Sequence, residues 1–317
     1  MGEEVGLNCE EAIWEKMTVR AYISLCEKAV EEVLNLERIC IDHDNLRGSV
    51  FLDPSLNFDH RIKSFFLVYE NGKLISMLSM FIPTKHEAEI TAYTLPKYRK
   101  KGYFKSLLEK AVEELRVFFI PDLLFVCENT SIPGKRVINA LKANYDHTEY
   151  FMRFDRASYS CITTYRLKLL KTERKELEKA IAAYMKVFGD SHEETKSQIK
   201  NCYELDTREQ YLAVLEDEII GVVSVNLEAE DVSIFGFGIV PEYRSKGYGK
   251  ELLHLIVESF LKRGRSDIII DVNSENADAL ELYRKTGFHI EVAYEYYRME
   301  IGEIKKKNLQ CDITRGV

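Results

Sequence analysis

One segment of this chain, read as a strand end, a turn and a helix, occurs twice, 145 residues apart. The first copy spans residues 96–115 (PKYRKKGYFKSLLEKAVEEL) and the second spans residues 241–260 (PEYRSKGYGKELLHLIVESF). Paired without gaps, the two copies share eleven of twenty residues. Solenoid repeats recur about every 20–50 residues, so the longer period indicates two duplicated domains.

The same offset relates other parts of the sequence. Residues 66–76 and 212–221 both consist of an apolar run, a polar turn and a second apolar run, which is the pattern of a β-hairpin. Segment 156–160 (RASYS) is the predicted junction. We therefore predict an α/β (α+β) chain with an N-terminal domain of residues 1–156 and a C-terminal domain of residues 160–317.

Composition narrows the class of protein. The 317 residues are 46% apolar and 30% charged, which is ordinary for a globular protein with two cores. The sequence holds neither an apolar run long enough for a membrane helix nor a basic, apolar leader, and we predict a cytoplasmic location with no membrane partner. The seven cysteines lack Cys-x-x-Cys spacing, so we predict free thiols and no metal. The net charge of −8 disfavours nucleic acid as a partner and mildly favours a cationic substrate. The sequence does not indicate an oligomeric state.

The second copy of the repeat carries a phosphate-binding pattern, Arg244-Ser245-Lys246-Gly247-Tyr248-Gly249, at the start of a helix. The two glycines let the backbone turn and approach a ligand. The first amides of a helix lack internal partners and lie at the positive end of its dipole. Such a turn suits a pyrophosphate, with Arg244 and Lys246 adding positive charge. A plain strand-to-helix turn is the alternative interpretation.

Two motifs together resemble a known family. Arg244-x-x-Gly247-x-Gly249 after a strand is similar to the acetyl-CoA-binding motif of the GNAT superfamily of N-acetyltransferases. The block Asn276-x-x-Ala-x-x-Leu-Tyr283-x-x-x-Gly-Phe resembles its second conserved segment. The resemblance covers residues 160–300. It implies a mixed, mostly antiparallel sheet with helices on both faces, which opens after the strand before the turn and holds the pantetheine arm there.

The resemblance also implies roles for individual residues. The amides of Arg244 to Gly249 would hold the pyrophosphate of acetyl-CoA, and the backbone of Ile239 and Val240 would pair with the pantetheine like an added strand. Asn276 would lie beside the arm, and Tyr283 would protonate the departing thiolate. Two plainer roles stay open: Asn276 as a helix cap and Tyr283 as a packing residue.

The general base is not identified by the sequence. The position where many family members have a glutamate falls near Ser233, which cannot accept the proton. Asp231, Glu228 and Glu230 lie close in sequence, and a water relay is equally compatible. We assign no base from the sequence.

The first copy departs from the motif. Its turn, a candidate second cofactor site, keeps the arginine and the first glycine but replaces the last glycine by phenylalanine; it consists of Arg99, Lys100, Lys101, Gly102, Tyr103 and Phe104. Depending on the alignment, Ile138 or Ala140 stands where Tyr283 stands in the second copy, and neither side chain has an acidic group that could donate a proton. We therefore predict a degenerate N-terminal domain, which supports the other domain or binds ligand without catalysis.

These observations predict an N-acetyltransferase that moves the acetyl group of acetyl-CoA to a primary amine by direct attack, catalysed by the C-terminal domain. The acceptor would be a small-molecule or peptide amine. The alternative is a non-catalytic acyl-CoA-binding or regulatory protein. A third reading, transfer of a longer acyl group, differs only in the depth of the pocket.

Overall fold

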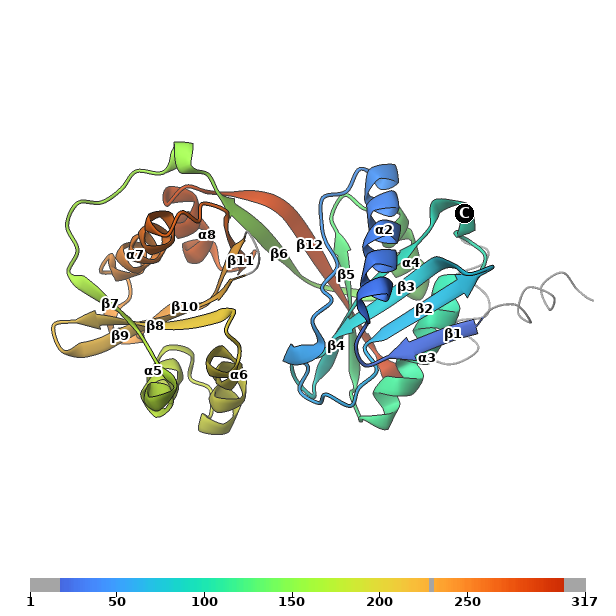
Figure 1. The fold of residues 1–317 in the computed structure, drawn as a ribbon, viewed down its shortest axis with the longest axis horizontal. Coiled ribbons are helices and arrows are strands. Elements are labelled where there is room, and N and C mark those ends of the chain that lie inside the picture. Colours follow the sequence, from blue (N-terminus) through green and yellow to red (C-terminus); the bar gives the residue numbers. More distant parts are fainter. Residues whose placement is uncertain (1–17, 228–230, 305–317) are drawn as a thin grey trace, which may run out of the picture. The chain divides into compact units, whose positions relative to one another are not determined.

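The computed structural model describes residues 18–227 and 231–304. Contacts divide it into two compact units (Figure 1). Unit 1 comprises the described residues up to His147 and those from Tyr294 onward, and unit 2 comprises the described residues from Thr148 to Ala293. No helix among the described residues is both long and apolar enough to cross a membrane.

Unit 1 is a sheet packed against helices. Its strands β1 to β4 are antiparallel neighbours, and β5 runs parallel to β4. The bounds are β1 Thr18–Tyr22, α2 Glu27–Asp44, β2 Phe65–Glu70, β3 Lys73–Phe81, β4 Glu87–Thr94, α3 Tyr103–Val117, β5 Asp122–Glu128 and α4 Ile132–Leu141. The apolar spacing of residues 19–41 in the sequence predicts a helix. This prediction is wrong for residues 19–22, because their backbone pairs with β2.

Unit 2 repeats this plan. Strands β7 to β10 are antiparallel neighbours, and β11 runs parallel to β10. The bounds are β7 Leu167–Lys171, α5 Leu177–Phe188, α6 His192–Glu204, β8 Arg208–Leu215, β9 Glu218–Leu227, β10 Val232–Ile239, α7 Tyr248–Lys262, β11 Ile268–Asn273 and α8 Ala277–Lys285. β4 and β10 begin and end 145 residues apart, as do α3 and α7. The predicted tandem α/β fold is confirmed.

Two long strands belong to both units. β6 (Asn144–Phe154) starts in unit 1, and its residues 149–153 pair with β11 in unit 2. β12 (Phe288–Glu300) starts in unit 2, and its residues 294–300 pair with β5 in unit 1. Each unit is therefore completed by a strand from the other half of the chain. This grouping differs from the predicted division at residues 156–160, because β6 and β12 fit equivalent places beside β11 and β5.

One arginine anchors each of these strands. Arg298 of β12 donates to Glu87, Asp122 and Asp146 at 2.7, 2.8 and 2.6 Å. Arg153 of β6 pairs with Asp267 and, at 2.7 Å, with Glu291. The two arginines are 145 residues apart. Networks of this kind fix register, because a shift by one residue would turn each guanidinium to the other face of the sheet.

Candidate active site in unit 2

The sheet of unit 2 opens where the resemblance implies. β10 pairs with β11 only over residues 232–234 and 268–270, and the two strands then diverge. A bulge between Phe235 and Gly238 shifts the register of β10 against β9. Gly236 has a φ of +54°, and a Cβ there would lie 2.6 Å from the hydroxyl of Tyr184 on α5. The missing side chain lets the bulged strand pack closely against α5. In unit 1, β4 and β5 likewise pair only over residues 87–90 and 122–125, although β4 has no bulge.

The glycine turn follows β10 directly. A short 3-10 helix (Pro241–Tyr243) leads into it, and α7 begins at Tyr248. Ser245 and Gly247 take left-handed conformations, with φ of +61° and +85°. The turn residues Arg244 to Gly247 are exposed, and the amide of Arg244 already donates to the carbonyl of Pro241 at 3.1 Å. Their binding of a pyrophosphate stays a prediction.

The cationic side chains of the motif support the turn. Arg244 donates from Nε to the carbonyl of Ile239 at 2.9 Å and from a terminal nitrogen to the carbonyl of Val187 at 2.8 Å. Lys246 donates from Nζ to the carbonyl of Glu242 at 2.8 Å. These contacts hold both cations against the protein backbone beside the turn, and their contribution of positive charge to a bound pyrophosphate stays a prediction. The backbone amides remain the groups best suited to the ligand.

Arg166 also reaches this turn, and sequence reasoning missed it. Its guanidinium lies 4.2 Å from the centre of the Tyr248 ring and donates to the carbonyl of Lys246 at 3.2 Å. It also pairs with the buried Glu251 of α7 at 3.1 Å. The sequence carries no signal for this contact, because Arg166 lies in the loop before β7.

Some backbone groups at the end of β10 and in Val240, which follows it, are already hydrogen-bonded within the protein. Val240 donates its N–H to the carbonyl of Ile220 at 2.9 Å and accepts from the amide of Tyr243 at 2.9 Å. The carbonyl of Ile239 accepts from Arg244. Pairing of the pantetheine with Ile239 and Val240 stays a prediction. Because neighbouring residues of a strand alternate in direction, the Ile239 N–H is the group that points away from β9.

Tyr283 lies in α8 and is buried among aromatic rings. Its ring centre is 6.1 Å from that of Phe237 on β10 and 6.2 Å from that of Phe288. Burial, and then the charge of Asp271, raise the pKa of Tyr283 well above its ordinary value of 10. The phenol is therefore protonated at neutral pH, as a general acid requires. Its catalytic use stays a prediction.

Asn276 caps α8, since its side chain accepts a hydrogen bond from the amide of Ala279 at 3.1 Å. The plainer of its two interpretations is therefore correct. Its contact with the pantetheine arm stays a prediction, compatible with capping because the residue is exposed.

Asp271 of β11 is the residue that the sequence interpretation missed. It lies just past the paired part of β11, at the opening. Although the residue keeps an exposed surface, loss of solvent around the carboxylate, and then the charge of Glu149, raise the pKa of Asp271 from 3.8 to about 7. A carboxylate with this pKa is suited to accept a proton at neutral pH. The sequence does carry a signal for this residue, since Asp271 is a single acid within the apolar run Ile268-Ile-Ile-Asp-Val.

The earlier base candidates lie elsewhere. Asp231 sits beside the first residue of β10, 3.9 Å from Arg153, at the end where β10 and β11 are paired. Ser233 is likewise in the paired part, opposite Ile269. Glu228 and Glu230 lie outside the described residues.

Unit 1 retains the turn. Lys100 and Gly102 have φ of +63° and +85°, close to their counterparts in unit 2, and Arg99 donates from Nε to the carbonyl of Thr94 at 3.0 Å. Lys101 lies over the ring of Tyr98, and the Tyr103 hydroxyl donates to Glu70 at 2.7 Å. The backbone shape of the motif is therefore preserved in both units.

The rest of the unit 1 site is altered. β4 pairs with β3 in unbroken register, without the bulge of β10. Tyr93 occupies the position of Gly238, and Phe104 that of Gly249. Helices α4 and α8 are capped by Ser131 and Asn276, which places Ile138, buried, at the position of Tyr283.

A loop also covers the end of β5 in unit 1. The carboxylate of Glu128 accepts from the amides of Arg47 and Gly48 at 2.8 and 2.9 Å. The hydroxyl of Tyr294 accepts from the amide of Ser49 at 3.2 Å. Residues 47–49 are therefore hydrogen-bonded to the end of β5 and to Tyr294 in unit 1.

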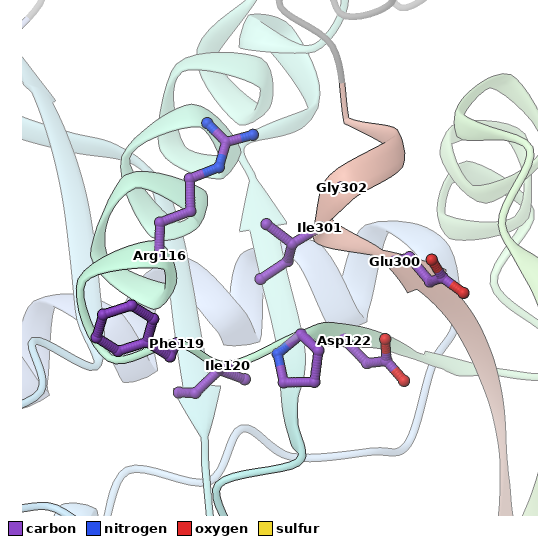
Figure 2. Close-up of a pocket in the computed structure, with 8 residues that line it drawn as sticks. Arg116, Phe119, Ile120, Asp122, Glu300, Ile301 and Gly302 are labelled. Carbon is purple, nitrogen blue, oxygen red and sulfur yellow. The ribbon is translucent and has the colours of Figure 1, made fainter.

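A surface pocket lies elsewhere in unit 1 (Figure 2). It is formed where α3 ends and β12 ends, with Phe119 and Ile301 among its lining residues. None of the predicted site residues lines it.

The comparisons with known proteins agree with this geometry. The model of the acetyltransferase (GNAT) family matches residues 30–126 and 173–288, which together are more than half of the chain. The chain belongs to the GNAT family. One of the two matched segments lies in each unit, so both units carry the family pattern.

Curated relatives match parts of this GNAT chain. It is 28% identical over 88 residues to a [ribosomal protein bS18]-alanine N-acetyltransferase of Haemophilus ducreyi, covering 27% of the chain and 61% of the relative. It is 30% identical over 115 residues to the uncharacterized N-acetyltransferase YvbK of Bacillus subtilis, covering 35% of the chain and 74% of the relative. The chain thus spans less than two thirds of the first of these.

Solved structures share the whole fold. A GCN5-related N-acetyltransferase from Sphaerobacter thermophilus has a TM-score of 0.73 at 16% identity, covering 90% of this chain and 96% of that one. A tandem GNAT protein from the clavulanic acid biosynthesis pathway has a TM-score of 0.69 at 14% identity, covering 91% and 100%. At these identities the likeness concerns the fold.

Proposed function

We propose that unit 2 transfers the acetyl group of acetyl-CoA to a primary amine by direct attack. The observation that carries this proposal is the placement of Asp271 and Tyr283 at one opening in the sheet. Burial, and then the charge of Asp271, keep Tyr283 a protonated phenol, while the surroundings of Asp271 leave its carboxylate a candidate base near pH 7. Two titratable groups held in opposite states suit acid–base chemistry.

The mechanism follows from these positions. The turn amides bind the pyrophosphate, and the acyl arm enters between β10 and β11. Asp271 accepts a proton from the amine, whose nitrogen then attacks the thioester carbonyl. The carbon–sulfur bond breaks, and Tyr283 donates its proton to the coenzyme A thiolate. Backbone amides near the bulge stabilise the developing oxyanion.

In this proposal unit 1 is the degenerate partner. Its turn supports ligand binding without chemistry, since Ile138 replaces the acid, Tyr93 and Phe104 replace glycines, and Val126 stands at the position of Asp271. The alternative, a wholly non-catalytic acyl-CoA-binding protein, fits unit 1. It leaves the buried phenol and the raised carboxylate pKa of unit 2 without a role.

The acceptor is a small-molecule or peptide amine. One relative is named for acetylating an alanine of a ribosomal protein. A peptide with an N-terminal alanine therefore belongs beside simple amines in a substrate panel.

The test is thiol release from acetyl-CoA with such a panel. Tyr283→Phe should lower kcat with little change in acetyl-CoA affinity, because the lost group acts in the transition state. Tyr203→Phe is a matched control, since that hydroxyl instead bonds Thr172 at 2.7 Å. Equal kcat for Tyr283→Phe and the parent, with chemistry rate-limiting, would remove Tyr283 from the mechanism. A panel without any acetylated amine would support the non-catalytic alternative.

A further inference from the structure

Glu149 reaches the opening of unit 2 on β6. In the antiparallel pair of β6 and β11, Asp271 lies opposite Phe151, and Asn273 lies opposite Glu149. Opposed residues project to the same face of a sheet, as do residues two apart. Glu149 and Asp271 are thus diagonal neighbours on one face, with Cβ atoms about 7 Å apart or less.

This face is the one turned away from α7 and α8. The alternate residues Ile270 and Val272 of β11, with Met152 of β6, belong to the buried core that includes α7 residues and Tyr283. Glu149, Phe151 and Asn273 are half-buried and Asp271 is exposed. The acyl arm starts at the α7 turn, so the face with the carboxylates is the side left for the acceptor.

Among residues 18–227 and 231–304, Arg153 is a cation on this part of the face, and it is already paired. Arg153, opposite Ile269, is held by Asp267 and Glu291, and Asp231 lies 3.9 Å away. Its charge is therefore balanced by its own carboxylates. The two acids nearest the reacting centre give the acceptor side a negative potential.

We propose that Glu149 selects acceptors carrying a second cationic group close to the reacting amine, such as a short aliphatic diamine or a peptide amine beside a basic side chain. This inference rests on the proposed function of unit 2 and names its substrate class. Asp271 takes the proton from one amine, while Glu149 binds the other as an ammonium. Phe151 lies between the two carboxylates on the same strand pair and offers an apolar surface for the carbon chain.

The experiment compares kcat/KM for cadaverine with that for pentylamine, which lacks the second amine. The parent should prefer the diamine by about tenfold, the effect of about 1.4 kcal/mol from one partly exposed charge pair. The comparison is made at pH 9, where Asp271 is ionised with or without the charge of Glu149. Glu149→Gln should there reduce the preference to about one, with a larger loss of kcat/KM for cadaverine than for pentylamine. Asp217→Asn, which removes one charge at the tip of the β8–β9 hairpin, should keep the preference.

Several outcomes would overturn the inference. A parent without a diamine preference, or a Glu149→Gln protein that keeps it, contradicts the role of Glu149 while leaving amine acetylation intact. Failure of the parent to acetylate any amine overturns the proposed function and this inference together. Should Glu149→Gln not fold by circular dichroism, Glu149→Asp replaces it. That variant keeps the charge on a shorter side chain and should retain part of the preference, so a preference fully lost there also contradicts the assignment.

Discussion

Replacing Asp271 by asparagine removes the proposed base with a small change in shape. The carboxyl group of the parent has a pKa of about 7. It is ionised in about a tenth of molecules at pH 6 and about nine tenths at pH 8, so kcat should rise about tenfold between them. Asp271→Asn should lower kcat at pH 8 by about 10²–10⁴-fold and lose this rise.

The ionised carboxylate of Asp271 should lower the free energy of unfolding. Its folded pKa lies above the unfolded value of 3.8, so the folded state is favoured at low pH and loses stability as the pH rises from about 4 to about 7. The full pKa difference corresponds to about 4 kcal/mol, which exposure of the residue reduces to about 1–2 kcal/mol. Asp271→Asn should therefore raise Tm by a few degrees at pH 8 and leave it nearly unchanged at pH 4.

The assays are a pH–rate profile of kcat and thermal unfolding at both pH values. Asp217→Asn serves as the control for a lost surface charge. A variant that keeps the rise in kcat near pH 7 would refute the assignment of the base. If Asp271→Asn brings no gain in Tm at pH 8, the raised pKa of Asp271, from which the stability gain was calculated, is refuted.

Three further predictions concern the fold that holds the site. Gly236→Ala should lower the free energy of unfolding by about 1–3 kcal/mol, because its Cβ would meet Tyr184. Gly264→Ala, where nothing lies within 4 Å of the added Cβ, should lower it only by the backbone strain, and denaturant titration compares the two variants. Arg298→Met should lower Tm, because three carboxylates lose their shared cation, and an unchanged Tm would contradict the anchoring role. A fragment of residues 1–156 should be less protected from hydrogen exchange in β5 than the full chain, because it lacks residues 294–300; equal protection would show that β12 is dispensable there.

Much of the fold was predictable from the sequence because the relevant signals are local. The glycine turn, the hairpins and the helix periodicity recur at one offset, and the structure keeps that offset from β4 to α8. The exchange of β6 and β12 was not predictable. Equivalent strands of two duplicated domains can pair with the same edge of either sheet. The observed pairing joins residues far apart in the sequence, such as Arg153 and Ile269, and local sequence patterns do not indicate it.

The candidate site likewise contains residues that the sequence predicts and residues that it does not. The turn and Tyr283 belong to contiguous motifs, so the sequence predicted where they fall. The pKa of Asp271 is raised by loss of solvent in the folded chain, and then by the charge of Glu149, more than a hundred residues earlier in the chain. The side chain of Arg244 turns to the carbonyls of Ile239 and Val187, which sequence spacing does not indicate.

The central claim is that catalysis resides in unit 2, and an exchange of equivalent residues tests it most directly. Gly249 has room for a Cβ, whose nearest neighbours would be Leu282 at 3.5 Å and Ile239 at 3.9 Å, and circular dichroism checks that Gly249→Phe folds. The measurement is kcat/KM for acetyl-CoA in Gly249→Phe and in Phe104→Gly, the reciprocal change in unit 1. The account predicts a loss of about 100-fold or more in the first and a change below about twofold in the second. An active Gly249→Phe protein beside an inactive Phe104→Gly protein would contradict it and assign catalysis to unit 1.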